Sequence, residues 1–349
     1  MKTVIVGAGQ TGRGFLNRLL AESGEKVIFL DKNESLIQLL NKTPSYTVSF
    51  GNEREPVVIQ NYSAFSISSQ EADTALKEAE LILISVGQNN LMQLHEKLAQ
   101  NLHEGQTVVV AENGIHPAEC FEDIASSCKF ELTEAIIFCT TLGNKDSLDI
   151  FSENLDKLPY DSTRISHTLS IKGAEGTADF SQLLERKIYT YNCISACIAY
   201  TGYEKGYSVY SEAANDPSIS SMVEHLCGGL NQSIAEEYHL PLKEQEDFSR
   251  MAIRKFSNPN IKDTIDRNVR NVPRKLGKKE RIIAPILLMN AHNQPCGDLL
   301  YFAACAFQCG MDRGELSMDE FDTVFADLPA EQRQSILSEL GNLKKRTAE

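Results

Sequence analysis

A glycine-rich turn near the start of the chain has the residue types and spacing of a dinucleotide-binding loop. The segment Gly7-Ala8-Gly9-Gln10-Thr11-Gly12 reads G-x-G-x-x-G, and it lies between the apolar run Thr3–Val6 and a helix-like segment. In this pattern Gly7 permits a tight turn, Gly9 lets the backbone approach a pyrophosphate, and Gly12 allows close packing of helix on strand. The pyrophosphate then binds at the positive end of the helix dipole. Gly7, Gly9, Gln10, Thr11 and Gly12 are therefore candidate cofactor contacts.

An acidic residue follows this turn at the distance that such a site requires. The next apolar run, Lys26–Leu30, is followed directly by Asp31, about 20 residues after the glycines, where a carboxylate binds the ribose hydroxyls of NAD. The same carboxylate repels the 2′-phosphate of NADP, so the predicted cofactor is NAD, although Lys32 lies beside it.

Two further polar turns follow apolar runs. Val86-Gly87 comes after Leu81–Ile84, and Glu112-Asn113 comes after Thr107–Val110. Ligands of open α/β sheets bind along the carboxyl edge of the strands, so we expect Val86, Gly87 and Asn113 to lie near the cofactor.

A second group of reactive side chains lies in a helix-like segment far along the chain. With 100° per residue, Tyr191 lies about 40° from Lys187, Ser195 about 80° and Asn192 about 140°. One arc of this helix thus carries an amine, an amide and hydroxyl groups. From the spacing alone, a solvated polar stripe is the commoner interpretation.

A basic segment stands out in an otherwise acidic chain. It comprises Arg267, Arg270, Arg274, Lys275, Lys278, Lys279 and Arg281, with Glu280 as the only acid among the last few. Such a cluster is either a solvated helix–loop surface or a phosphate-binding site, because guanidinium and ammonium groups bind phosphate oxygens directly.

The elements that must position these residues change in character along the chain. The first part alternates buried strand-like runs with helical spacing, and a further strand is expected over residues 135–141. Later segments read almost entirely as helices, at 181–203, 217–238, 242–256, 281–291, 297–309 and 329–345. The predicted fold is therefore α/β: a Rossmann-like dinucleotide-binding domain over 1–180, with a parallel sheet, and a mainly α-helical substrate and catalytic domain over 181–349.

Composition narrows the class of protein. The formal net charge of −14 argues against general affinity for nucleic acid or anionic membranes, and no apolar run is long enough to span a bilayer. The N-terminus enters a strand at once, which leaves no room for a signal peptide. The nine cysteines show no metal-binding spacing and are expected to be reduced core residues. We expect a cytoplasmic protein, a monomer or small homo-oligomer, that acts on a small molecule.

Several motifs in order resemble the polyol-specific long-chain dehydrogenases. They are the opening segment Gly7 to Phe15, Glu112-Asn113, Glu185-Arg186-Lys187 with Asn192 five residues later, Phe256-x-Asn258-Pro259-x-x-Lys262-Asp263 and Arg274-Lys275-Leu276. The resemblance runs from residue 1 to about 310. It implies a Rossmann-like domain followed by a helical domain, with NAD as cofactor and no metal.

The resemblance also implies roles for particular residues. Lys187 is the general acid/base, and Asn113 and Asn192 donate hydrogen bonds to the oxygen that gains negative charge. Arg274 and Lys275 bind the phosphate of the substrate. The implied reaction interconverts a hexitol phosphate and a ketose phosphate, such as mannitol 1-phosphate and fructose 6-phosphate.

The chain departs from the family pattern in two places. Ser195 stands where the family helix carries a histidine, and Phe138-Cys139-Thr140 replaces an Asp-Arg-Ile segment. Ser195 can donate a hydrogen bond but does not titrate near neutrality, and His116 is an alternative source of an imidazole. Three other interpretations therefore stay open: an enzyme for an unphosphorylated polyol or a hexuronate, a non-catalytic NAD-binding protein, and an assembly protein that reuses the fold.

Overall fold

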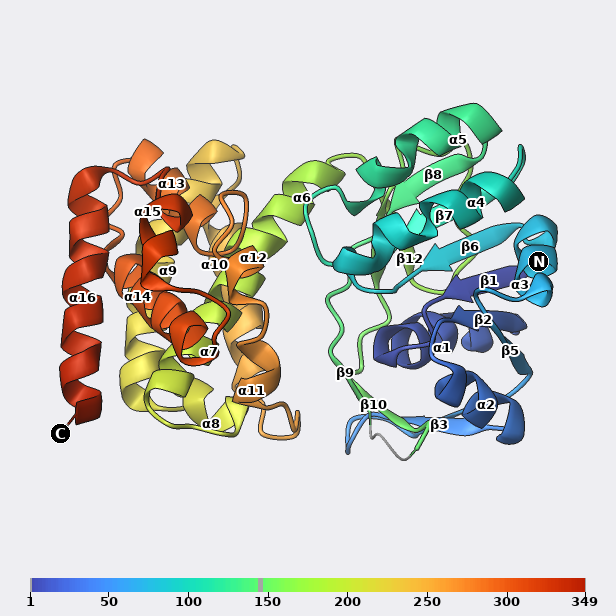
Figure 1. Cartoon of the computed structure of the whole chain (residues 1–349), viewed down its shortest axis with the longest axis horizontal. Helices are drawn as coiled ribbons and strands as arrows, with labels where there is room; N and C mark the ends of the chain where they lie inside the picture. Colours follow the sequence, from blue (N-terminus) through green and yellow to red (C-terminus); the bar gives the residue numbers. More distant parts are fainter. Residues whose placement is uncertain (1, 144–146, 349) are drawn as a thin grey trace. The chain divides into compact units, whose positions relative to one another are not determined.

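The structure of the chain is a computed structural model that describes residues 2–143 and 147–348, with side chains as far as residue 343. The chain divides into two compact units, Met1–Ser181 and Gln182–Glu349 (Figure 1).

The first unit is built on a six-stranded parallel sheet. Its spatial order is β5-β2-β1-β6-β7-β8, which is 3-2-1-4-5-6 when the strands of this sheet are counted along the chain. That is the order of a doubly wound dinucleotide-binding fold, so the predicted Rossmann-like class is confirmed. The strands are β1 (Thr3–Val6), β2 (Val27–Asp31), β5 (Tyr62–Ser66), β6 (Leu81–Ile84), β7 (Thr107–Val110) and β8 (Glu131–Glu134).

Helices cover both faces of this sheet, which explains why its central strands are almost uninterrupted apolar runs. Ile5 and Leu83 belong to the core shared with α1, whereas Val6 and Ile84 belong to the core shared with α3 and α4. The helices of this unit are η1 (Gly12–Leu16), α1 (Asn17–Glu22), α2 (Glu34–Lys42), α3 (Gln70–Glu78), η2 (Gln88–Leu94), α4 (His95–Asn101), η3 (Pro117–Phe121) and α5 (Glu122–Cys128).

The prediction of a strand over residues 135–141 is wrong. The sixth strand of the sheet is β8, which ends at Glu134, and Ala135 forms only an isolated bridge with Tyr160. Three of the four residues of β8 are polar (Glu131, Thr133 and Glu134), so a search for apolar runs does not detect this strand. Thr133 and Glu134 are nevertheless fully buried. Six short strands form two smaller sheets: β3 (Tyr46–Ser49), β4 (Val57–Ile59), β9 (Thr141–Gly143), β10 (Ile150–Ser152), β11 (Leu158–Asp161) and β12 (Ala174–Thr177).

The second unit is helical in its described residues, as the sequence predicts. Its helices, with α6 beginning at the boundary, are α6 (Phe180–Lys187), η4 (Ile188–Asn192), α7 (Cys193–Glu204), α8 (Tyr210–Ala214), α9 (Pro217–Glu237), α10 (Leu242–Phe256), α11 (Ile265–Asn268), α12 (Val272–Lys275), α13 (Ile283–Ala291), α14 (Gly297–Asp312), η5 (Met318–Glu320), α15 (Phe321–Val324) and α16 (Ala330–Ala348).

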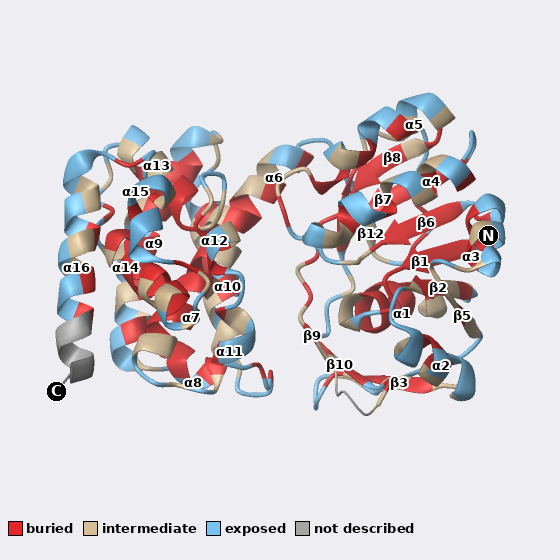
Figure 2. Ribbon diagram, in the orientation of Figure 1, coloured by how far each residue is buried: buried red, intermediate tan, exposed pale blue. Residues whose placement is uncertain are grey.

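The core of the second unit forms around α7 and α14, most of whose residues are buried (Figure 2). Cys193, Cys197, Cys305 and Cys309 lie in this core, and none of the nine cysteines, all of which the structure describes, forms a disulfide. The short helices α8, α11 and α12 span only four or five residues each, too few for apolar periodicity to reveal them. Within the described residues, none of the helices is both long enough and apolar enough to cross a membrane.

Candidate active site

The glycine-rich turn lies at the point where the strand order of the sheet reverses. Gly7 follows β1, and the turn after β6 begins at Ser85. Gly7 has a positive φ of 102°, and a Cβ at this position would lie 2.0 Å from Ser85 O. Only glycine therefore lets these two loops approach, at the place where open α/β sheets bind their ligands.

The other two glycines of the motif have different environments. A Cβ on Gly12 would lie 2.0 Å from Gly7 O, so Gly12 is required for the packing of the turn itself. A Cβ on Gly9 would meet no protein atom within 4 Å, and its φ is not in the left-handed region. The fold therefore does not require glycine at position 9. The open space above its backbone is where a bound pyrophosphate would need access.

Asp31 lines a pocket of about 240 Å³ together with Gly7, Gly9, Val86 and other residues of these loops. Asp31 Oδ2 accepts a hydrogen bond from Ala8 N at 2.7 Å, and Oδ1 accepts one from Asn33 N at 2.9 Å. Each carboxylate oxygen retains a further lone pair, so a diol can still bind.

Lys32 lines the same pocket but is bonded elsewhere. Its Nζ donates to Asn90 Oδ1 at 2.8 Å and lies 3.4 Å from Gln93 Oε1, both on η2. The Lys32 ammonium is thus held by η2.

The next two loops are bonded to each other. Gly87 N donates to Glu112 Oε1 at 2.5 Å, and Gly87 has a positive φ of 85°. Glu112 is buried, whereas Asn113 beside it is exposed. The pairing fixes the loop that carries Asn113 relative to the loop that carries Val86.

His116, close to Asn113, adopts a left-handed conformation with φ 45°. Its Nδ1 lies 3.3 Å from Glu134 Oε1, which also accepts from Arg164 Nη1 at 3.1 Å. Burial raises the pKa of the Glu134 carboxyl, while His116 and Arg164 act in the opposite direction. His116 is therefore a half-buried side chain in contact with a buried carboxylate at the end of β8.

In the second unit, Lys187 has the environment of a general acid/base. Its side chain is buried, and burial is the main reason that its pKa falls from 10.5 to about 7. The positive charges of Arg281 and Lys255 lower the pKa further, and Glu280 partly offsets them. An amine with this pKa exchanges protons readily at neutral pH.

The helix that carries Lys187 is not regular, which corrects the angles expected from the sequence. Residues Ile188–Asn192 form a π-helical turn, and Cys193 N donates to Ile188 O. Since a π-turn bonds residue i to residue i+5, residue i+5 lies over residue i, as residue i+4 does in an α-helix. Asn192 follows Lys187 by five residues and so shares its face, instead of lying 140° away.

Ser195, at the position of the family histidine, is half-buried and bonded. Tyr210 OH lies 3.0 Å from Ser195 Oγ and 3.1 Å from Ser195 O. Burial raises the pKa of Tyr210, so its hydroxyl stays protonated and donates to Ser195.

The basic segment is more neutralised than its composition suggests. Acidic residues outside it pair with three of its members: Arg267 with Asp263, Arg270 with Asp266 and Lys278 with Asp327. Arg274 and Lys275, the phosphate contacts expected from the sequence, are half-buried and buried, respectively.

A charged group forms around Glu280. Arg274 Nη1 lies 2.6 Å from Glu280 Oε1, and Arg281 Nε lies 3.0 Å from Glu280 Oε2. Lys275 Nζ donates to the backbone carbonyl of Asn268. Burial is the main cause that lowers the pKa of Lys275 to about 7, followed by Arg281 and Arg274.

Comparison with known proteins decides the family. Residues 1–138 match the mannitol dehydrogenase Rossmann domain, and residues 179–338 match the mannitol dehydrogenase C-terminal domain. The chain belongs to the mannitol dehydrogenase family. Membership makes it an NAD-dependent polyol dehydrogenase, so the predictions of an oxidoreductase and of NAD as cofactor are confirmed.

The sequences of several relatives align with most of this chain. The chain is 30% identical over 301 residues to a mannitol-1-phosphate 5-dehydrogenase of Bacillus subtilis, covering 80% of this chain and 81% of the relative. It is 29% identical over 360 residues to a protein of the same name from Sclerotinia sclerotiorum, covering 95% and 92%. The fold is also that of Pseudomonas fluorescens mannitol 2-dehydrogenase, with a TM-score of 0.74, 12% identity and coverage of 98% and 90%.

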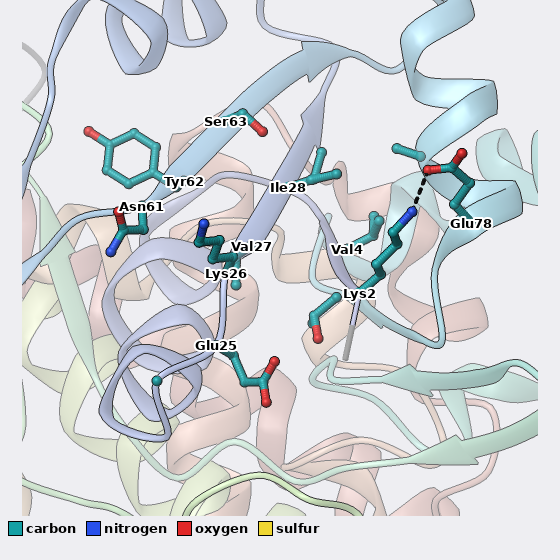
Figure 3. A pocket seen from close by; sticks show the side chains of 13 residues that line it. Lys2, Val4, Glu25, Lys26, Val27, Ile28, Asn61, Tyr62, Ser63 and Glu78 are labelled. Carbon is teal, nitrogen blue, oxygen red and sulfur yellow. Dashed lines mark hydrogen bonds and ion pairs between the residues drawn. The ribbon is translucent and has the colours of Figure 1, made fainter.

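A second pocket, of about 640 Å³, lies at the amino-terminal edge of the six-stranded sheet, opposite the edge that carries the glycine-rich loop. It is lined by the first residues of β1, β2 and β5, and an ion pair of 2.8 Å between Lys2 and Glu78 borders it (Figure 3). Ligands of this fold bind at the carboxyl ends of the strands, so this pocket is separate from the cofactor loops.

Sequence reasoning missed residues that set the chemistry of Lys187. Lys255 lies on α10, and Arg281 was counted in the basic segment without a link to Lys187. A local sequence pattern cannot show that Lys255 and Arg281 lie near Lys187 in the fold. Among the described residues, no three His, Cys, Asp or Glu side chains are grouped so that they could hold a metal ion.

Proposed function

We propose that this dehydrogenase interconverts a hexitol phosphate and a ketose phosphate, of the mannitol 1-phosphate and fructose 6-phosphate type, with Lys187 as the general acid/base. The observation that carries the proposal is the buried Lys187 ammonium, whose pKa lies near 7 and whose helix face also bears Asn192. The two curated relatives described above are named mannitol-1-phosphate 5-dehydrogenases, which supports the choice of substrate.

The proton-transfer chemistry follows from the residue types. When the alcohol is oxidised, the neutral amine of Lys187 takes the hydroxyl proton, and in the reverse direction its ammonium returns a proton to the carbonyl oxygen. The amides of Asn192 and Asn113 donate hydrogen bonds to that oxygen as it gains negative charge. Ser195, fixed by Tyr210, is a further hydroxyl group on the same helix.

The first unit fits the dinucleotide. Gly7 and Gly9 give the pyrophosphate access to the backbone, and Asp31 binds the ribose hydroxyls, with Gln10, Thr11, Gly12, Val86, Gly87 and Asn113 as further contacts. Bound NAD supplies the hydride chemistry. In this proposal residues 1–180 form the dinucleotide-binding domain and residues 181–349 the substrate and catalytic domain, and no metal takes part, because Lys187 and the amides handle the oxygen.

The group around Glu280 supports a phosphorylated substrate. Arg274 and Arg281 both pair with the Glu280 carboxylate, and after burial their positive charges contribute to the lowered pKa of Lys275. A phosphate dianion would offset these positive charges. Arg274 and Lys275 remain the proposed contacts, and we add Arg281, whose charge also acts on Lys187.

A substrate panel tests the proposal. With NADH, fructose 6-phosphate should be reduced much faster than fructose or a hexuronate. Faster turnover of the unphosphorylated sugars would favour the alternative polyol or hexuronate reductase, and no substrate-dependent turnover at all would favour a non-catalytic protein.

We expect the enzyme in the cytoplasm, as a monomer or small homo-oligomer.

A further inference from the structure

The π-helical turn after Lys187 is held by buried polar groups of α10. Gln245, which is 0% exposed, is the central member of this group. Its Oε1 accepts a hydrogen bond from Arg186 Nε at 3.2 Å, and its Nε2 donates to Thr190 Oγ1 at 2.8 Å. A single side chain therefore binds the residue immediately before Lys187 and a residue inside the π-turn.

The amide of Gln245 supplies both an acceptor and a donor to this pair of contacts. Its Oε1 serves Arg186, and its Nε2 serves the hydroxyl oxygen of Thr190 and lies 3.4 Å from Asn231 Oδ1. A glutamate would lack the donor, and an apolar side chain would lack both. Because Gln245 and Thr190 are fully buried, neither bond is replaced by bulk water when it is lost.

Other residues of α10 support the same segment. Glu244 lies 3.1 Å from Arg186, and the Phe248 ring packs against both the Arg186 guanidinium and the Tyr191 ring. These contacts anchor both ends of the turn, but the bonds of Gln245 are the ones that join residue 186 to residue 190.

The consequence concerns the relation of Lys187 to Asn192. In a regular α-helix these two residues would lie about 140° apart, whereas the π-turn puts Asn192 over Lys187. A π-turn is rare and gives up regular α-helical bonding, so it persists where surrounding contacts hold it, often at functional sites. We propose that Gln245 is a positioning residue of the dehydrogenase, which acts through Arg186 and Thr190 to hold Lys187 and Asn192 on one face.

The inference rests on the proposed role of Lys187, and the experiment separates the two. Four variants would be compared by turnover of NADH with fructose 6-phosphate: Gln245→Met, Thr190→Val, Thr190→Ser and, as a matched control, Ser249→Ala. Ser249 belongs to the same buried network, but its hydroxyl donates to Asn231 and not to the turn. Thermal unfolding of each variant confirms that it is folded.

We expect Gln245→Met and Thr190→Val to lower kcat about 10- to 100-fold, because misplacement of a catalytic group by about 1 Å can cost about 100-fold in rate. The NADH dissociation constant should stay within about twofold, because the proposed cofactor contacts belong to the first unit. Thr190→Ser should recover most of the turnover, and Ser249→Ala should lose stability but keep its kcat. In the slow variants the pKa seen in the pH profile should rise from about 7 toward the ordinary lysine value of 10.5, as the amine becomes less enclosed.

Two results would overturn the inference: a folded Thr190→Val enzyme with wild-type kcat and pH profile, or a Ser249→Ala enzyme that loses as much turnover as Thr190→Val. If Lys187→Ala is inactive in the same assay, either result refutes the positioning role alone. If Lys187→Ala keeps wild-type turnover, the proposed role of Lys187 as general acid/base is refuted.

Discussion

The backbone N–H of Ala8 donates a hydrogen bond to Asp31 Oδ2 at 2.7 Å, and this bond joins the glycine-rich loop to the end of β2. In the proposed cofactor site, the carboxylate that would select the cofactor is thus held by the same loop that would receive the pyrophosphate. Its orientation does not depend on the ligand.

The first prediction concerns the choice between NADH and NADPH. Asp31 should give at least several-fold tighter binding of NADH, because its fixed carboxylate repels a 2′-phosphate, and Asp31→Ala should narrow the difference. Fluorescence titration with both nucleotides measures it. Glu78→Ala, which removes an acid at the opposite edge of the sheet, is the matched control and should leave the ratio unchanged. Equal affinities in the wild type would contradict the role of Asp31.

The glycines of the loop give a second prediction. Gly9→Ala should fold with nearly normal stability, since its Cβ meets no protein atom, but should bind NADH more weakly because the methyl group occupies the pyrophosphate's path. Gly12→Ala should destabilise the protein itself, since its Cβ would lie 2.0 Å from Gly7 O. Thermal unfolding and NADH titration distinguish these effects. Normal NADH affinity in Gly9→Ala would place the pyrophosphate elsewhere.

The third prediction tests the phosphate site. Arg274→Ala should raise the KM for fructose 6-phosphate about 10- to 150-fold, the value of a lost charge-assisted contact of roughly 1.5–3 kcal/mol, with little change in NADH affinity. Lys278→Ala is the control from the same segment, because Lys278 is exposed and pairs with Asp327. Equal, small effects of both variants would show that the segment is a solvated surface.

A fourth prediction links stability to pH. Because the pKa of Lys187 is lower in the folded state than in the unfolded state, its protonation destabilises the fold. This destabilisation is complete below pH 7, decreases as the pH rises, and is absent above about pH 10.5. Lys187→Met should therefore be inactive yet more stable than the wild type, by on the order of 1 kcal/mol or more near pH 6. The advantage should shrink as the pH rises toward 10. Urea unfolding at several pH values measures it, and a less stable variant near pH 6 would show that partners of the ammonium outweigh its burial.

The fold was largely predictable because its strands are uninterrupted apolar runs and its later helices are long. β8 was not, since Thr133 and Glu134 are polar residues buried by partners distant in sequence, such as Arg164. The glycines could be singled out from motif and spacing, whereas Lys187 and Asn192 became candidates only through the family resemblance. The π-turn could not be predicted, because it depends on Gln245, more than fifty residues away, and sequence spacing alone assumes a regular helix. The acidic partners of the basic segment could not be predicted either, because a partner such as Asp327, which pairs with Lys278, lies far from it in the sequence.

The measurement that tests the account most directly is the pH dependence of kcat/KM for oxidation of mannitol 1-phosphate by NAD, in the wild type and in Lys187→Ala. Oxidation needs the neutral amine, so the wild-type value should rise with pH and level off above a pKa near 7, while reduction of fructose 6-phosphate should fall over the same range. Lys187→Ala should be about 10²- to 10⁴-fold slower, should lose this pKa and should still bind NADH. A variant that keeps half of the wild-type activity with an unchanged profile would show that another group carries the proton.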